Sequence, residues 1–111
     1  MEKRILGKTG LLVSILTFGG FLLDKVEAGR AREIVAFAIE NGINYFDIAP
    51  SYGNAQSVLG PALAPYRKDV YLASKTKERG AAGAKAELLR TLKELKTGCL
   101  DNFQFHSVDT M

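Results

Sequence analysis

The sequence predicts an α/β fold built around a parallel sheet, and three observations lead to this prediction. Segments rich in β-branched and aromatic residues alternate with segments whose apolar residues recur at helical spacing. Single helices separate successive strands, which favours parallel strands joined by crossover connections. Several of the predicted strands end near a chemically reactive side chain. With 111 residues, 47% of them hydrophobic, the chain is long enough for one modest core.

The N-terminal part is predicted to hold a hairpin, a strand and a helix. Residues 3–13 contain two short extended pieces around the turn sequence Gly7-Lys8-Thr9-Gly10. An apolar run at 14–18, ended by two glycines, predicts the first strand of the sheet. Apolar residues at helical offsets then predict a helix that stops at Gly42. These residues are Ala31, Ile34, Val35, Ala38 and Ile39.

The next segments repeat the order of strand and helix. Residues 43–48, INYFDI, are β-branched and aromatic and predict a buried strand. A short helix is expected over about 55–64, where Pro61 should kink or interrupt it because proline lacks a backbone N–H. The sequence VYLAS at 70–74 predicts the third strand.

A third helix, closed by Gly98, and a fourth strand at 101–105 complete the series. The helix is marked by Leu88, Leu89, Leu92 and Leu95. Two architectures share this order, the open doubly wound sheet and the eight-stranded barrel. The sequence has no Gly-x-Gly-x-x-Gly motif after the first strand and no Walker loop, so neither nucleotide-binding motif supports the open sheet. Periodicity alone does not choose between the two, but the reactive side chains do.

Four such side chains stand at or just beyond the C-terminal ends of predicted strands. Asp47 is near the end of the second strand, Tyr52 lies five residues later, and Lys75 and His106 directly follow the third and fourth strands. In a parallel barrel these strand ends converge on the catalytic face. Each residue alone has an ordinary structural explanation. Together they favour a site, because Asp47 lies in an apolar strand where an unpaired carboxylate is costly, and Lys75 could be its partner.

The motifs around these residues resemble the aldo-keto reductase family. GINYFDIAPSYGNAQSVL at 42–59 is similar to the signature around that family's catalytic Asp and Tyr, and LGKTGLLVSILTFGG at 6–20 resembles its hairpin and first strand. LASK, ending at Lys75, and LLRTLKELKTGCLDNFQFH, ending at His106, resemble its catalytic lysine and histidine strands. The resemblance implies the N-terminal half of a (β/α)8 TIM barrel preceded by a short β-hairpin, with residues 1–111 forming one partial domain.

The sequence also departs from the family pattern at a few positions. Gln56 stands where the family commonly has Glu, and Gly98-Cys99 stands where an Asp followed by an aromatic residue is usual. Pro61 is unusual in its helix. None of these departures removes a catalytic group, so we expect their effects to be limited to local packing and helix ends.

The resemblance implies reversible hydride transfer between a nicotinamide cofactor and a small-molecule carbonyl substrate. The cofactor is usually NADPH, with NADH as the alternative. Tyr52 would be the general acid, although an ordinary tyrosine releases its proton only near pH ~10. The Lys75 ammonium would favour the phenolate, Asp47 would keep Lys75 charged and oriented, and neutral His106 would hydrogen-bond the carbonyl. Gly20, Phe21 and Asp47 would bind the nicotinamide end of the cofactor.

Composition argues against several other functions. The net charge is +3, and no block of like charges or basic patch interleaved with aromatics indicates nucleic-acid binding. The single Cys99 excludes an internal disulfide framework or a cysteine-based metal cluster and suits a reducing compartment. An apolar stretch at 11–23 is interrupted and falls short of the ~20 residues of a membrane span. A cytoplasmic protein without a metal site is expected.

The length of the chain leaves three interpretations. A complete barrel takes about 250 residues, so a first interpretation is a truncated and inactive reductase fragment. A second is a non-catalytic half-barrel that binds or assembles with partners, self-associating through its exposed strand edges. Some members of the family serve as channel-associated subunits. A third is another barrel or a doubly wound fold, in which the four reactive positions are coincidental.

Overall fold

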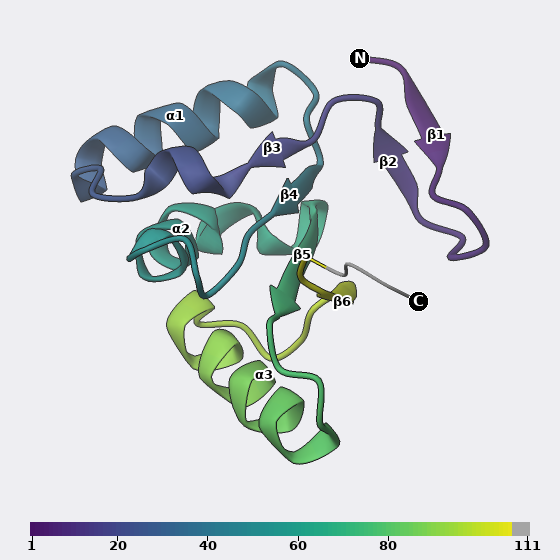
Figure 1. Cartoon of the computed structure of the whole chain (residues 1–111). Coiled ribbons are helices and arrows are strands. Elements are labelled where there is room, and N and C mark those ends of the chain that lie inside the picture. The colour runs from purple at the N-terminus through teal and green to yellow at the C-terminus, as the bar shows by residue number, and fades with distance from the viewer. Residues whose placement is uncertain (108–111) are drawn as a thin grey trace.

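The computed structural model describes residues 1–107 and begins with a small antiparallel hairpin beside a parallel sheet (Figure 1). Strand β1 (Lys3–Ile5) pairs with β2 (Leu12–Ser14), which confirms the predicted hairpin. The side chain of Asn44 ties the hairpin to the sheet. It accepts a hydrogen bond from the Ser14 amide at 2.7 Å and donates one to the Leu12 carbonyl at 3.0 Å.

The parallel sheet contains four strands in the order in which they occur in the chain. They are β3 (Phe18–Gly19), β4 (Tyr45–Asp47), β5 (Tyr71–Thr76) and β6 (Asn102–Phe105). Each strand pairs in parallel with the next. A doubly wound sheet would instead reverse its strand order at a switch point and carry helices on both faces.

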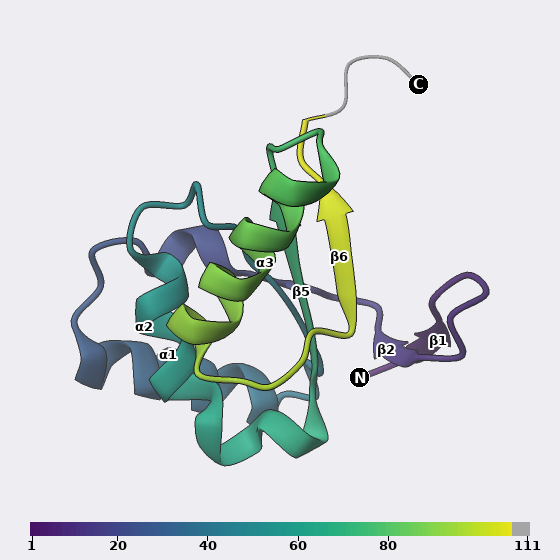
Figure 2. The ribbon, with the colours of Figure 1, turned by 90° about the horizontal axis from the view of Figure 1, so that it is seen from below.

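The connecting helices all lie on one face of this sheet (Figure 2). They are α1 (Ala28–Glu40), α2 (Ala55–Leu63) and α3 (Ala81–Leu95), with short 3₁₀ segments η1 (Gly20–Leu23) and η2 (Ala64–Asp69). Strand order and one-sided helices together make this an arc of a (β/α) barrel wall. They confirm the predicted half-barrel over the described residues; residues 108–111 of the predicted domain lie outside them.

The core fills the space between the sheet and the helices. Phe46 and Leu72 are almost completely buried there, and the Phe18 and Phe46 rings lie 5.0 Å apart. Val35 of α1 and Leu59 of α2 pack into the same cluster. Because strand side chains alternate between faces, the neighbours of these core residues project from the opposite, uncovered face.

Several predicted strand boundaries were wrong. The second strand of the sheet is confined to Tyr45–Asp47 rather than residues 43–48. The first parallel strand is confined to Phe18–Gly19 rather than residues 14–18, because Ser14 is already paired in the hairpin and its hydroxyl donates to the Leu16 carbonyl. Lys75 lies inside β5 rather than after it, because pairing with β6 extends that strand to Thr76.

The predicted interruption of one helix and the predicted end of another were also wrong. Pro61 does not interrupt α2, which runs to Leu63 and continues as η2. Proline deprives the Ser57 carbonyl of its helical donor, but Ser57 is exposed, so water can take the donor's place. Helix α3 ends at Leu95, followed by Lys96 in the left-handed conformation with φ 54°, and is not closed by Gly98. By contrast, α1 stops as predicted, with Gly42 at φ +90° just beyond its end. No helix within residues 1–107 is long and apolar enough to cross a lipid bilayer.

Candidate active site

The four predicted catalytic residues gather at the C-terminal end of the sheet. Asp47 is the last residue of β4, Lys75 is next to last in β5, and His106 follows β6 directly. Tyr52 lies in the loop between β4 and α2. Asp47 and Lys75 alternate with residues buried under the helices, so both project from the uncovered face.

Lys75 and Asp47 form an ion pair at the centre of this group. The Lys75 Nζ atom lies 2.7 Å from Asp47 Oδ2 and donates a second hydrogen bond to the Ile48 carbonyl at 2.9 Å. The two side chains are only 12% and 29% exposed. The carboxylate in the apolar strand thus has the partner that the sequence suggested, and the ammonium is held by two oxygens in a partly desolvated place.

Tyr52 is packed between the other aromatic groups of the site. Lys75 Nζ is 5.1 Å from the centre of its ring. The rings of Phe21 and His106 meet it edge to face, with centroids at 5.4 Å and 5.8 Å. Phe21 comes from η1 and is 63% exposed. The phenol therefore stands over the ammonium, between an exposed aromatic side chain and an imidazole.

Two residues that sequence reasoning missed hold the Tyr52 loop against the end of η1. Asp24 Oδ1 accepts from the Asn54 amide at 3.1 Å, and Asn54 Oδ1 accepts from the Lys25 amide at 2.7 Å. Gly53 lies between them at φ +60°, and a β-carbon there would come within 2.0 Å of the Asp24 carboxylate. The Gly-Asn pair after Tyr52 is a turn signal, but its partner Asp24 is distant in sequence.

His106 is held at the end of β6 by contacts with both neighbouring loops. Its amide donates to the Thr76 carbonyl at 2.8 Å, and the Arg79 guanidinium donates to its own carbonyl. Ser51 Oγ lies 3.3 Å from its Nδ1 atom. Desolvation, with help from the Lys75, Lys77 and Arg79 charges, lowers the pKa of His106 below its ordinary 6.5, against an opposing effect of Asp47. The imidazole is therefore neutral at pH 7.

Comparison with known proteins agrees with this geometry. Residues 15–111 match the model of the aldo/keto reductase family. The chain belongs to that family. Uncharacterised oxidoreductase YqkF of Bacillus subtilis is 33% identical over 120 residues, covering 96% of this chain and 39% of its own length. The holo form of aldo-keto reductase AKR11C1 from Bacillus halodurans superposes with a TM-score of 0.80 at 34% identity, covering 96% of this chain and 40% of its own.

A third relative is an aldo-keto reductase from Klebsiella pneumoniae in complex with NADPH. It superposes with a TM-score of 0.78 at 26% identity, covering 92% of this chain and 38% of its own. The chain thus spans about two fifths of the length of the relatives it matches. Family membership supports an oxidoreductase, and the half-barrel described above is part of the family's barrel.

The three residues predicted to bind a cofactor lie at the same end of the sheet as the catalytic candidates. Gly20 is buried against Ile48 and the Asp47 carbonyl, where a β-carbon would clash with both. Phe21 is exposed at the rim. Asp47 Oδ1 is buried and has no hydrogen-bond partner within residues 1–107. Such an atom calls for an external donor, and a hydroxyl group such as that of a ribose would satisfy it. The residues present therefore fit a nicotinamide nucleoside.

Gln56, one of the positions at which the sequence was expected to depart from the family pattern, is buried and hydrogen-bonded. Gln56 is 2% exposed. Its amide donates to Glu94 Oε1 at 2.8 Å and to the Thr91 hydroxyl at 3.4 Å, and its carbonyl accepts from the Ser74 hydroxyl at 2.8 Å. The neutral amide supplies donors as well as an acceptor, so Gln56 links α2, α3 and β5 without leaving a buried polar atom unpaired.

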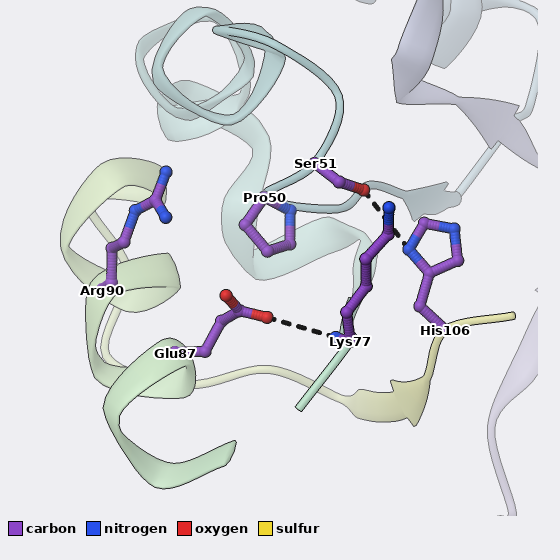
Figure 3. A pocket seen from close by; sticks show the side chains of 6 residues that line it. All are labelled: Pro50, Ser51, Lys77, Glu87, Arg90 and His106. Atoms are coloured by element: carbon purple, nitrogen blue, oxygen red, sulfur yellow. Dashed lines mark hydrogen bonds between the residues drawn. The ribbon is translucent and has the colours of Figure 1, made fainter. Parts of the chain in front are cut away.

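A small polar pocket lies beside His106, on the α3 side of the site (Figure 3). Its lining residues are Pro50, Ser51, Lys77, Glu87, Arg90 and His106. Within residues 1–107, no group of three His, Cys, Asp or Glu side chains could hold a metal ion.

Proposed function

We propose that the protein reduces aldehydes or ketones to alcohols with a nicotinamide cofactor, NADPH by preference or NADH. The observation that carries this proposal is the convergence of Asp47, Lys75, Tyr52 and His106 at one end of the sheet. Membership of the aldo/keto reductase family and the NADPH complex of the Klebsiella relative support it.

The proposed reaction divides the work among these four side chains. When bound, a nicotinamide cofactor would be the source of the hydride that reduces the carbonyl carbon. Tyr52 gives its hydroxyl proton to the carbonyl oxygen as negative charge develops there. The Lys75 ammonium, 5.1 Å from the Tyr52 ring centre, stabilises the phenolate that remains, and Asp47 fixes the ammonium. Neutral His106 donates a hydrogen bond to the same carbonyl oxygen.

Cofactor binding would rely on the rim of the same site. Asp47 Oδ1 would accept a hydrogen bond from a ribose hydroxyl, and the ring of exposed Phe21 would pack against the nicotinamide. Because Gly20 has no side chain, its backbone can lie close to Ile48 and the Asp47 carbonyl at this rim. The exposed Cys99 thiol suits a reducing compartment such as the cytoplasm.

We further propose that residues 1–111 do not turn over substrate by themselves. Barrel enzymes commonly hold a cofactor phosphate in the loops after strands seven and eight, whereas the described residues supply four parallel strands. Asp47, Gly20 and Phe21 alone would bind only the nicotinamide end, which gives too few contacts for stable cofactor binding.

The alternative is a non-catalytic half-barrel that assembles with a partner. The observation that favours it is β6, an edge strand on which Phe105 is 58% exposed. An open edge and an exposed aromatic side chain promote association. Under this alternative the chain forms a stable oligomer in sedimentation experiments, and neither the chain nor the fusion described below shows Tyr52-dependent turnover.

A complementation experiment tests the proposed function. The region of YqkF that follows the part aligned with this chain would be fused to residues 1–111, and NADPH binding and aldehyde reduction would be measured for the chain and for the fusion. We expect neither property in the chain alone and both in the fusion. Tyr52→Phe in the fusion should lower turnover by about 10²-fold or more. Tyr66→Phe, which removes a hydroxyl from η2, is the matched control.

The proposal fails if a folded fusion binds NADPH but reduces no carbonyl compound. It also fails if Tyr52→Phe is no more harmful than Tyr66→Phe. Saturable NADPH binding with Tyr52-dependent turnover by residues 1–111 alone would refute the second proposal, that the chain is inactive by itself.

A further inference from the structure

Ser51 stands between the Tyr52 loop and His106, in a position to act on the imidazole. It precedes Tyr52 in the chain, and its Oγ atom lies 3.3 Å from His106 Nδ1, a contact across 55 positions of sequence. Figure 3 shows the hydroxyl and the ring facing each other at the edge of the polar pocket. Within residues 1–107, this is the hydrogen bond of the Ser51 side chain.

The contacts of His106 hold one nitrogen of its ring and leave the other available to a ligand. Its backbone is fixed by the hydrogen bond to Thr76 and by the Arg79 guanidinium, and Tyr52 packs edge-on against the ring. Nδ1 faces Ser51, whereas Nε2 has no hydrogen-bond partner within residues 1–107. The ring is thus held from one nitrogen and is free to bind at the other.

A neutral imidazole carries its proton on one nitrogen only, so the partner of one nitrogen decides what the other can do. The Lys75, Lys77 and Arg79 charges and desolvation favour the neutral form. A serine hydroxyl can donate or accept. The unprotonated ring nitrogen is a stronger base than a hydroxyl oxygen, so the better bond has Ser51 donating to Nδ1. The proton of the ring then resides on Nε2.

We propose that Ser51 is a positioning residue that fixes the Nε2–H tautomer of His106. This inference rests on the proposed function, in which His106 donates a hydrogen bond to the substrate carbonyl. In the Nε2–H tautomer the free nitrogen presents a proton to that oxygen. In the other tautomer it presents a lone pair, which would repel the charge that develops during reduction. Setting one imidazole nitrogen by a hydrogen bond to the other is a general device of histidine sites.

The sequence makes this proposal directly measurable, because His106 is its single histidine. Long-range ¹H–¹⁵N correlation spectra of ¹⁵N-labelled residues 1–111 at pH 7.5 would report its tautomer without overlap. We expect the Nε2–H form to predominate. In Ser51→Ala the ratio of Nε2–H to Nδ1–H should fall about fivefold, the scale of one lost hydrogen bond. Ser51→Thr keeps the hydroxyl and should keep the ratio.

Ser57→Ala is the matched control, because Ser57 is an exposed serine on neighbouring α2. It should leave the tautomer unchanged. An Nδ1–H form in the unmodified chain would overturn the proposal. So would a Ser51→Ala variant whose backbone amide spectrum is native and whose tautomer ratio is that of the unmodified chain.

Turnover by the YqkF fusion separates this inference from the proposed function. Ser51→Ala should lower kcat about fivefold with the KM for NADPH unchanged, and Ser51→Thr should restore it. If the tautomer depends on Ser51 but the folded fusion reduces nothing, the proposed function is wrong and the tautomer assignment stands. If the fusion is active but the tautomer ratio does not change in Ser51→Ala, the proposed function stands and the role assigned to Ser51 is wrong.

Discussion

The central strands and the edge strand that carry the site are built differently. Strands β4 and β5 are each paired on both sides, and the core residues Phe46 and Leu72 on them are 0% and 1% exposed. Strand β6 is paired on one side within the described residues, and Phe105 on it is 58% exposed. Both regions end in a proposed catalytic side chain.

This difference divides the site into two parts. Asp47 and Lys75 are held by the paired strands of the barrel wall, whereas His106 is held by a few individual hydrogen bonds. Asp47 and Lys75 are placed by strand register and by the packed core beneath them. His106 depends on a backbone hydrogen bond to Thr76, on the Arg79 guanidinium and on the Ser51 hydroxyl. A buried strand can move only with its neighbours, whereas an edge strand can open locally. We therefore expect the ion pair to keep its geometry more firmly than the histidine does.

The largest expected effect is the difference in the free energy of unfolding between a core substitution in a central strand and a substitution in the edge strand. Phe46→Ala should lower the free energy of unfolding by about 3–5 kcal/mol, because it leaves a cavity under α1 and α2. Phe105→Ala should lower it by about 0.5 kcal/mol, since this side chain is mostly exposed. Urea denaturation followed by circular dichroism gives both values. Equal losses would mean that β6 is buried in solution, as an assembled oligomer would require.

Removing one partner of the central ion pair should have the next largest effect. Asp47→Asn removes the negative charge beside the Lys75 ammonium and leaves it only neutral oxygen acceptors. We expect a loss of about 1–2 kcal/mol, below the value for a fully buried pair because Asp47 is partly exposed. Glu33→Gln breaks the exposed Arg30–Glu33 pair and should change stability by less than about 0.5 kcal/mol. Similar losses for the two variants would show that the Asp47–Lys75 pair is solvated.

Amide hydrogen exchange compares two equivalent hydrogen bonds at the two strand ends. The Ile48 amide donates to Ala73 at 3.0 Å, and the His106 amide donates to Thr76 at 2.8 Å. Despite its shorter bond, the His106 amide should exchange about tenfold faster because the edge strand opens locally. Arg79→Gln should speed it by about a further fivefold and leave Ile48 unchanged. Equal protection in the unmodified chain would contradict the proposed division.

The smallest effect concerns the protonation of His106. Its folded-state pKa is lowered, so the unfolded chain binds the extra proton more readily. The stability contributed by the neutral ring is therefore full above about pH 6.5 and is lost as the pH falls through this value toward the folded-state pKa. The difference in urea midpoint between the unmodified chain and His106→Gln, measured from about pH 7.5 to 5.5, should shrink or reverse on acidification. NMR titration of the single imidazole gives the pKa itself, and a pKa above 6.5 would refute the prediction.

Much of the fold could be predicted because its signals are local. The turn around Gly7 and Gly10 and the helix stop at Gly42 follow from residues a few positions apart, and the structure confirms both. The exact ends of strands could not be predicted in this way. Lys75 lies inside β5 because β6, almost thirty residues later, extends the pairing to Thr76. Pairing of this kind depends on a neighbour that the local sequence does not contain.

The residues of the site likewise divide into those that local sequence could predict and those that it could not. Asp47 and Lys75 could be paired from the sequence, because a carboxylate in an apolar strand requires a partner. Ser51, Asp24 and Arg79 could not, because each is an ordinary loop residue whose role depends on a distant element. Asp24 meets Asn54 across two loops, and Ser51 meets His106 across the sheet.

By itself, the sequence determined the alternation of strands and helices, the family motifs and the identities of the reactive side chains, since these follow from periodicity and from residue chemistry. Only the tertiary structure decided that the strands run in chain order under helices on one face, which makes a barrel wall and not an open doubly wound sheet. It also decided which nitrogen of His106 faces Ser51. Both depend on contacts between segments far apart in the chain, whose directions are set by how the whole sheet twists and packs.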